Sequence, residues 1–128
     1  MGAVILVVED DLPSLELASY LLEHQGHRVH RAENGRFGLD AALDLGGSLD
    51  LVLSDIQMPD LDGYEFLSAL RRHPRFATLP VIAITAFSMR GDEQKILESG
   101  FDGYISKPID PEQFVHQVCQ WLPPEHRL

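Results

Sequence analysis

The stretch Val4-Ile5-Leu6-Val7-Val8-Glu9-Asp10-Asp11 decides how the rest of the sequence is interpreted. Its first five residues are apolar and mostly β-branched, a pattern typical of a strand buried on both faces. Asp11 can cap a following helix, and Pro13 falls in the first turn of that helix, where its missing N–H costs nothing. The stretch therefore predicts a buried strand that passes directly into a helix, with three carboxylates at the junction.

The alternation of strand and helix continues along the chain. We expect further strands at residues 28–31, 51–54, 80–84 and 103–106. We expect helices at residues 12–25, 35–45, 64–72 and 88–99, and a last helix from Asp110-Pro111 to Leu122. Five strand–helix pairs predict an α/β fold with an open parallel sheet and right-handed crossovers. Residues 1–122 form the predicted domain, and residues 123–128 a short polar tail.

Composition and charge exclude several classes of function. A chain of 128 residues is long enough for one domain with a sizeable core. Twenty Asp and Glu against ten Lys and Arg give a formal net charge of −10, which repels a nucleic-acid backbone. The apolar runs are too short to cross a membrane, and no signal-peptide pattern precedes the first one. Cys119 is the one cysteine and is expected to be a buried structural thiol, so we predict a cytoplasmic protein.

Polar side chains follow four of the predicted strands. Asp10, Asp55, Thr85 and Lys107 come after the first, third, fourth and fifth strands in the chain. Ligands of open parallel sheets bind at the carboxyl ends of the strands, so these side chains are expected to converge. Taken singly, an acid after a strand is more often a helix cap, and a lone lysine is more often a solvated surface charge. Their joint placement favours a functional site.

The residue types at this edge suit a divalent cation and a phosphoryl group. Glu9, Asp10 and Asp55 would repel one another unless a cation lay between them. Their oxygen atoms suit Mg²⁺, with Mn²⁺ as an alternative ion. A carboxylate such as Asp55 can attack phosphorus and form an acyl phosphate. Lys107 can then neutralise the phosphoryl oxygens, and Thr85 can donate a hydrogen bond to them.

Four stretches carry a specific resemblance to a known family. They are residues 5–11 (ILVVEDD), 50–63 (DLVLSDIQMPDLDG), 80–86 (PVIAITA) and 103–108 (GYISKP). Together they resemble the response-regulator receiver domains of two-component signalling over essentially the whole chain. The resemblance implies a flavodoxin-like fold: a five-stranded parallel sheet in the order 2-1-3-4-5, with helices on both faces.

The resemblance also assigns roles at the metal and phosphoryl sites. Asp55 would accept the phosphoryl group, Asp10 would bind Mg²⁺ directly, and Glu9 would act on the metal through water. The backbone carbonyl of Gln57 would be a further metal ligand. Lys107 would pair with the phosphoryl group, and the peptide bond between it and Pro108 is expected to be cis.

A second set of residues would report the state of the site. By resemblance, Thr85 is the switch hydroxyl that moves to bond the phosphoryl group, and Tyr104 is the aromatic side chain that turns into the vacated space. The face made by helix four, strand five and helix five would then change shape. Gln57 and Phe87 stand where side chains can flank the phosphoryl group, and we expect bulky Phe87 to slow self-dephosphorylation by hindering water.

The favoured function is a signalling switch that is phosphorylated by a histidine kinase or a histidine phosphotransfer protein and signals to a downstream protein. It would catalyse only its own phosphorylation and slow self-dephosphorylation, bind neither nucleic acid nor membrane, and be a monomer or a phosphorylation-dependent dimer. One alternative is a degenerate receiver that binds a protein without phosphorylation. Another is a hydrolase of the haloacid-dehalogenase type, whose nucleophile lies in a D-x-D motif after strand one, where this chain has Glu9-Asp10-Asp11.

Overall fold

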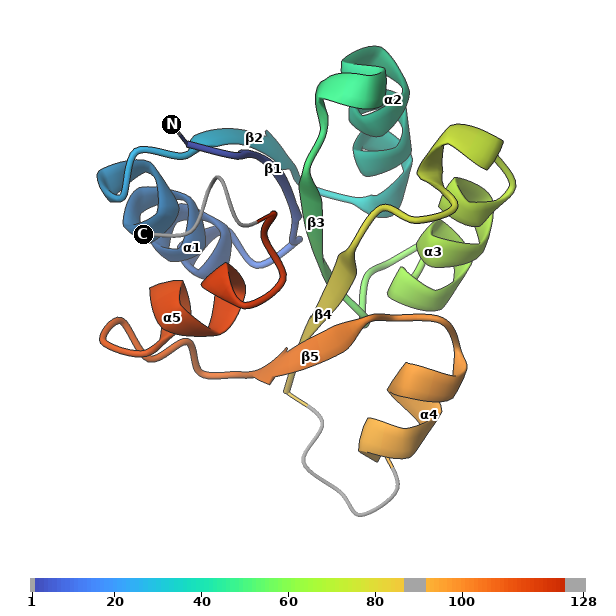
Figure 1. The fold of residues 1–128 in the computed structure, drawn as a ribbon. Helices are drawn as coiled ribbons and strands as arrows, with labels where there is room; N and C mark the ends of the chain where they lie inside the picture. Colours follow the sequence, from blue (N-terminus) through green and yellow to red (C-terminus); the bar gives the residue numbers. More distant parts are fainter. Residues whose placement is uncertain (1, 87–91, 124–128) are drawn as a thin grey trace.

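A single parallel sheet organises the computed structural model, which describes residues 2–86 and 92–123. The strands are β1 (Val4–Val8), β2 (Arg28–Ala32), β3 (Leu51–Asp55), β4 (Val81–Thr85) and β5 (Gly103–Ser106). They lie in the order β2-β1-β3-β4-β5, which confirms the predicted fold class and strand order (Figure 1). Because β2 pairs with one side of β1 and β3 with the other, the winding reverses between β1 and β3. Such a reversal is where open sheets bind their ligands.

Helices cover both faces of the sheet. Within the described residues the α-helices are α1 (Leu12–His24), α2 (Gly35–Leu45), α3 (Gly63–Arg71), α4 (Asp92–Glu98) and α5 (Phe114–Cys119). Two 3-10 turns, η1 (Gly46–Ser48) and η2 (Pro74–Phe76), follow α2 and α3. Helices α1 and α5 lie on one face of the sheet, and α2 and α3 lie on the other (Figure 1).

The sheet divides the apolar core into two clusters. Ile5 and Val7 of β1 belong to the cluster under α1 and α5, whereas Leu6 and Val8 belong to the cluster under α2 and α3. All four side chains are fully buried, because helices cover both faces of this strand. Each such burial stabilises the fold by about 1.5–3 kcal/mol. The continuous apolar run at the start of the chain therefore follows from the position of β1 in the middle of the molecule.

One predicted helix differs from the observed one, and another is described only in part. Helix α4 is described over Asp92–Glu98, and the expected residues 88–91 lie outside the described part of the chain. Helix α5 begins at Phe114 and not near Asp110, because the three residues before it form a turn. In that turn the Asp110 carboxylate accepts a hydrogen bond from the Glu112 N–H (3.0 Å), and the Asp110 carbonyl accepts one from the Phe114 N–H (2.9 Å), so Asp110 caps the turn that leads into α5.

Two smaller expectations need correction as well. Cys119 is half-buried and not fully buried, since it ends α5 near the surface. Asp11 occupies the N-cap position of α1 as expected, but its carboxylate accepts a hydrogen bond from the Ser14 hydroxyl and none from the backbone of the first turn.

The start of α3 lies tightly against the end of β3. Asp62 caps α3 and forms a capping box with Glu65, through hydrogen bonds of 2.9 and 3.1 Å. Gly63 donates its N–H to the Ile56 carbonyl (2.8 Å), and a Cβ atom at this position would lie 2.4 Å from the Asp55 carbonyl oxygen. Only glycine allows this approach, so the segment from β3 to α3 has a fixed course.

Arg71, the last residue of α3, fastens two other connections. Its Nη1 donates hydrogen bonds to the carbonyls of Phe76 and Leu79, both at 2.7 Å. Its Nη2 donates to the Gly100 carbonyl (3.4 Å) and to the Asp102 carboxylate (3.2 Å). The guanidinium thus joins the end of α3 to the segment before β4 and to the turn between α4 and β5.

Candidate phosphoryl-acceptor site

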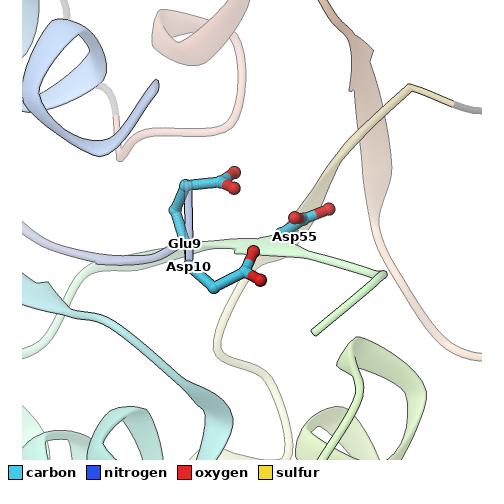
Figure 2. Close-up of side chains that lie close together, drawn as sticks. All are labelled: Glu9, Asp10 and Asp55. Carbon is cyan, nitrogen blue, oxygen red and sulfur yellow. The ribbon is translucent and has the colours of Figure 1, made fainter. Parts of the chain in front are cut away.

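The carboxyl ends of four strands bring the predicted site residues to one edge of the sheet. Glu9 and Asp10 follow β1, Asp55 ends β3, Thr85 ends β4, and Lys107 follows β5. The carboxylates of Glu9, Asp10 and Asp55 point toward a common space (Figure 2). One oxygen atom from each of the three carboxylates lies within 4.8 Å of the other two. The convergence expected from the strand order is therefore present.

The Asp55 side chain is held by the backbone that follows it. Only 5 % of the residue is exposed, and its Oδ1 accepts hydrogen bonds from the N–H groups of Ile56 (2.7 Å) and Gln57 (3.3 Å). The Ser54 hydroxyl donates to the Asp55 backbone carbonyl (2.9 Å). Because Oδ1 is fixed in this way, Oδ2 is directed toward the Lys107 ammonium at 3.3 Å. The side chain is thus positioned before any ligand arrives.

Lys107 lies across the acidic site. Its Nζ is 2.9 Å from the Glu9 carboxylate and 3.3 Å from the Asp55 carboxylate. Its backbone N–H donates to the Thr85 carbonyl (2.8 Å), which extends the pairing of β4 with β5 by one residue. The peptide bond between Lys107 and Pro108 is cis, as expected. A cation carried by β5 therefore neutralises acids carried by β1 and β3.

Burial and crowding of like charges raise the pKa of Glu9 and of Asp10. Burial raises the pKa of Glu9 to about 7; the hydrogen bond from Lys107 lowers it, and the nearby Asp55 raises it further. Burial also raises the pKa of Asp10, again with a contribution from the charge of Asp55. For Lys107, burial lowers the pKa, but the hydrogen bond with Glu9 and the charge of Asp55 outweigh it and raise the pKa overall. The site therefore has a deficit of positive charge that one ammonium does not remove.

The donor set fits a small hard cation. Glu9, Asp10 and Asp55 offer oxygen atoms only, which are the ligands that Mg²⁺ prefers. Glu9 Oε2 is fully buried and makes no hydrogen bond; its contact with the Lys107 ammonium is an ion pair without hydrogen-bond geometry. A cation or one of its bound waters would satisfy this oxygen. The acidic triad is thus consistent with Mg²⁺ binding.

The other predicted site residues that the structure describes differ in how deeply they are buried. Thr85 is buried, whereas the Gln57 side chain is exposed. Tyr104 on β5 is half-buried, and a hydrogen bond with Glu93 of α4 raises the pKa of its hydroxyl. Phe87 lies outside the described residues, so its expected place beside the phosphoryl group stays a prediction. Sequence reasoning missed Glu93, because its contact depends on how α4 packs beside β5.

Comparison with known proteins decides the family. The model of the response regulator receiver domain matches residues 5–119. The chain belongs to this family. As a receiver domain it is 37 % identical over 122 residues to the polar-differentiation response regulator DivK of Brucella anthropi, and the match covers 95 % of this chain and 98 % of that protein. Receiver domains partner with histidine kinases and are not a conventional enzyme family.

Solved structures agree with the assignment. The chemotaxis response regulator CheY4 of Vibrio cholerae superposes with a TM-score of 0.88 at 27 % identity, covering 95 % of this receiver domain and 100 % of that chain. The receiver domain of the sensor histidine kinase PA1611 of Pseudomonas aeruginosa superposes with a TM-score of 0.84 at 28 % identity, covering 94 % and 98 %. That structure carries a magnesium ion in its active-site cleft. Within the described residues of this chain, no helix is long and apolar enough to cross a membrane.

Proposed function

We propose that this receiver domain is a phosphorylation-controlled switch that accepts a phosphoryl group on Asp55 from a phosphohistidine. The observation that carries the proposal is the position of the Lys107 ammonium, 2.9 Å from Glu9 and 3.3 Å from Asp55. From this position the Lys107 ammonium can pair with the oxygen atoms of a phosphoryl group on Asp55. The donor would be a histidine kinase or a histidine phosphotransfer protein.

The metal would be Mg²⁺, with Mn²⁺ as a substitute. Asp10, Asp55 and the backbone carbonyl of Gln57 would bind it, and Glu9 would act on it through water. When bound, it would offset charge on the transferring phosphoryl group. The buried Glu9 oxygen that makes no hydrogen bond supports this assignment.

The residues of the chain would perform a single displacement. A carboxylate oxygen of Asp55 attacks phosphorus as the P–N bond of the donor breaks, and the electron pair of that bond leaves with the imidazole nitrogen. The backbone N–H groups of Ile56 and Gln57 hold Asp55 in place during this step. Lys107 pairs with the phosphoryl oxygens, and Thr85 donates its hydroxyl hydrogen bond to them.

Switching would follow from the new charge. A phosphoryl group brings about two negative charges into a site that is already acidic. Thr85 would move toward it, and Tyr104 would turn inward, away from Glu93. The face formed by α4, β5 and α5 would then present a different surface to a downstream protein, either from a monomer or from a phosphorylation-dependent dimer.

Gln57 and Phe87 would set the lifetime of the phosphorylated form. Gln57 follows the acceptor Asp55 by two residues, and Phe87 follows Thr85 by two residues. If Phe87 hinders the attacking water, Phe87→Ala shortens the half-life of the phosphorylated protein. An unchanged or longer half-life in that variant would contradict this role.

The boundaries and setting of the switch are part of the proposal. We infer one receiver domain over residues 1–122 and a tail over 123–128, in a cytoplasmic protein that binds neither nucleic acid nor membrane. Its catalysis would be limited to its own phosphorylation and slow self-dephosphorylation. A degenerate receiver would be expected to lack part of the acid and lysine set, which this chain has in full. The acceptor lies after β3 and not after β1, which disfavours the hydrolase alternative.

Small-molecule phosphorylation tests the proposal. The protein is incubated with acetyl phosphate and Mg²⁺, and its intact mass is followed over time. We expect one phosphoryl adduct in the wild type and none in Asp55→Asn. Asp60→Asn is the matched control and should keep the adduct. Asp60 is an exposed acid five residues away, and asparagine tolerates its positive φ. If the wild type forms no adduct, phosphorylation-independent protein binding becomes the better account.

A further inference from the structure

Few buried contacts hold helix α4 in place. Within the described residues it spans Asp92–Glu98, and Ile96 is its one buried residue there. Contacts of its exposed side chains with the rest of the protein therefore help to decide where α4 lies. Those contacts differ between its carboxyl end and its body, and the difference suggests how the helix moves.

The carboxyl end of α4 is anchored by hydrogen bonds of the Arg71 and Asp102 side chains. Gly100, which follows it, has a φ of 109° and offers its carbonyl to Arg71 (3.4 Å). Asp102 accepts hydrogen bonds from Arg71 (3.2 Å) and from the Val81 N–H at the start of β4 (2.8 Å). This end is therefore fixed to both α3 and the sheet.

The body of α4 interacts with one tyrosine on each side, Tyr64 and Tyr104. The Lys95 ammonium lies 5.2 Å from the centre of the Tyr64 ring, in a cation–π contact. The Tyr64 ring also packs edge-on against Phe101, with ring centres 6.0 Å apart. On the other side of α4, the interaction with Glu93 raises the pKa of the Tyr104 hydroxyl. One of these tyrosines is the expected switch residue, and the other has no assigned role.

Tyr64 is coupled to the acceptor by its neighbour in the chain. Gly63 lies so close to the Asp55 carbonyl that a Cβ atom would be only 2.4 Å from it. A shift of the backbone at Asp55 is therefore passed to the start of α3, where Tyr64 is the next residue. An open surface groove of about 500 Å³ lies at this place and is lined by Ile56, Gln57, Met58, Asp62, Tyr64 and Lys95. It leaves room for the ring and the ammonium to separate.

We propose that Tyr64 and Lys95 form a latch that holds α4 in the conformation described here, and that α4 swings about Gly100 when the latch opens. The role of the latch in signalling rests on the proposed function and deepens it: phosphorylation of Asp55 opens the latch through Gly63, on the opposite side of α4 from Tyr104. The latch itself exists without phosphorylation, which makes it testable separately.

Amide hydrogen exchange of α4 in the unphosphorylated protein tests the latch. Tyr64→Leu and Lys95→Met should each speed exchange of residues 92–98 by about two- to fivefold, the range that an exposed cation–π contact supports. The double variant should exchange no faster than Tyr64→Leu, because Tyr64→Leu already removes the contact that Lys95→Met removes. Lys95→Arg should restore slow exchange. Tyr20→Leu, an exposed tyrosine on α1, and Arg28→Met on β2 serve as matched controls and should leave α4 unchanged.

Phosphorylation kinetics then test the coupling. If the latch opposes the phosphorylated state, Lys95→Met should react with acetyl phosphate about two- to fivefold faster than wild type. Unchanged exchange in both single variants, or additive effects in the double variant, would overturn the latch. Faster exchange with an unchanged phosphorylation rate would overturn the coupling. Failure of the wild type to form an adduct at Asp55 would instead overturn the proposed function, and the exchange result would still decide the latch.

Discussion

Lys107 donates a hydrogen bond of 2.9 Å to Glu9, although 98 positions separate the two residues in the chain. The contact is partly buried, since the Glu9 side chain is 1 % exposed and that of Lys107 is 18 % exposed. It joins the ends of β5 and β1, two strands that are not adjacent in the sheet. The contact therefore forms only when the whole sheet is assembled, and a phosphoryl group on Asp55 would compete for the same ammonium.

Replacing Lys107 tests how much this contact stabilises the protein. In Lys107→Met, Glu9 stays buried without its partner, and we expect the free energy of unfolding to fall by about 1–3 kcal/mol at pH 8 without divalent cations. Urea denaturation measures this change. Arg36→Met removes an exposed cation and should change the free energy by less than about 0.5 kcal/mol. Equal stability of Lys107→Met and wild type at pH 8 would contradict the assigned contact.

The raised pKa of Glu9 predicts the sign of a pH dependence. Its value is 4.5 in an unperturbed carboxyl and about 7 in the folded protein, so the folded state holds this proton more tightly than the unfolded state. The stabilisation from protonated Glu9 is complete below pH 4.5 and is lost as the pH rises to about 7. We therefore expect metal-free protein to lose stability over this window and Glu9→Gln to lose less. A steeper loss in Glu9→Gln than in wild type would exclude the assignment.

The parts of the fold that could be predicted are those with a local cause. A strand buried on both faces must be apolar throughout, so β1 was visible in the sequence, and parallel strands must bring Asp10 and Asp55 to one edge. The predicted start of α5 was wrong because residues 111–113 form a turn bonded to Asp110, and composition does not distinguish such a turn from the first turn of a helix. The contact of Tyr64 with Lys95 could not be predicted, since it depends on the distance between two helices that are far apart in the chain.

Alanine substitutions at Gly63 and at Gly47 should differ in their effect on the free energy of unfolding. Gly63→Ala places a methyl group 2.4 Å from the Asp55 carbonyl, so we expect a loss of about 1–3 kcal/mol in the free energy of unfolding. Gly47→Ala meets no atom within 4 Å and should be neutral or slightly stabilising. Thermal and urea denaturation of the two variants provide the comparison. Equal stability of the two would show that the close approach at Gly63 is not needed.

Arg71 should be the most important arginine of the described residues for stability. Arg71→Met removes hydrogen bonds to three carbonyls and one carboxylate, and we expect a loss of about 2–4 kcal/mol. Arg72→Met, at the next and exposed position, is the matched control and should change little. Faster hydrogen exchange at residues 100–102 should accompany the loss in Arg71→Met. If only Arg72→Met were destabilising, the anchoring role of Arg71 would be wrong.

Chemical trapping identifies the residue that carries the phosphoryl group, which we expect to be Asp55. An acyl phosphate is reduced by borohydride to an alcohol, which converts an aspartyl phosphate into homoserine. After incubation with acetyl phosphate and Mg²⁺, peptide mass spectrometry should find homoserine at position 55 and only there, and omission of the metal should abolish it. Homoserine at Asp10 or at another acid, or its formation in Asp55→Asn, would contradict the account.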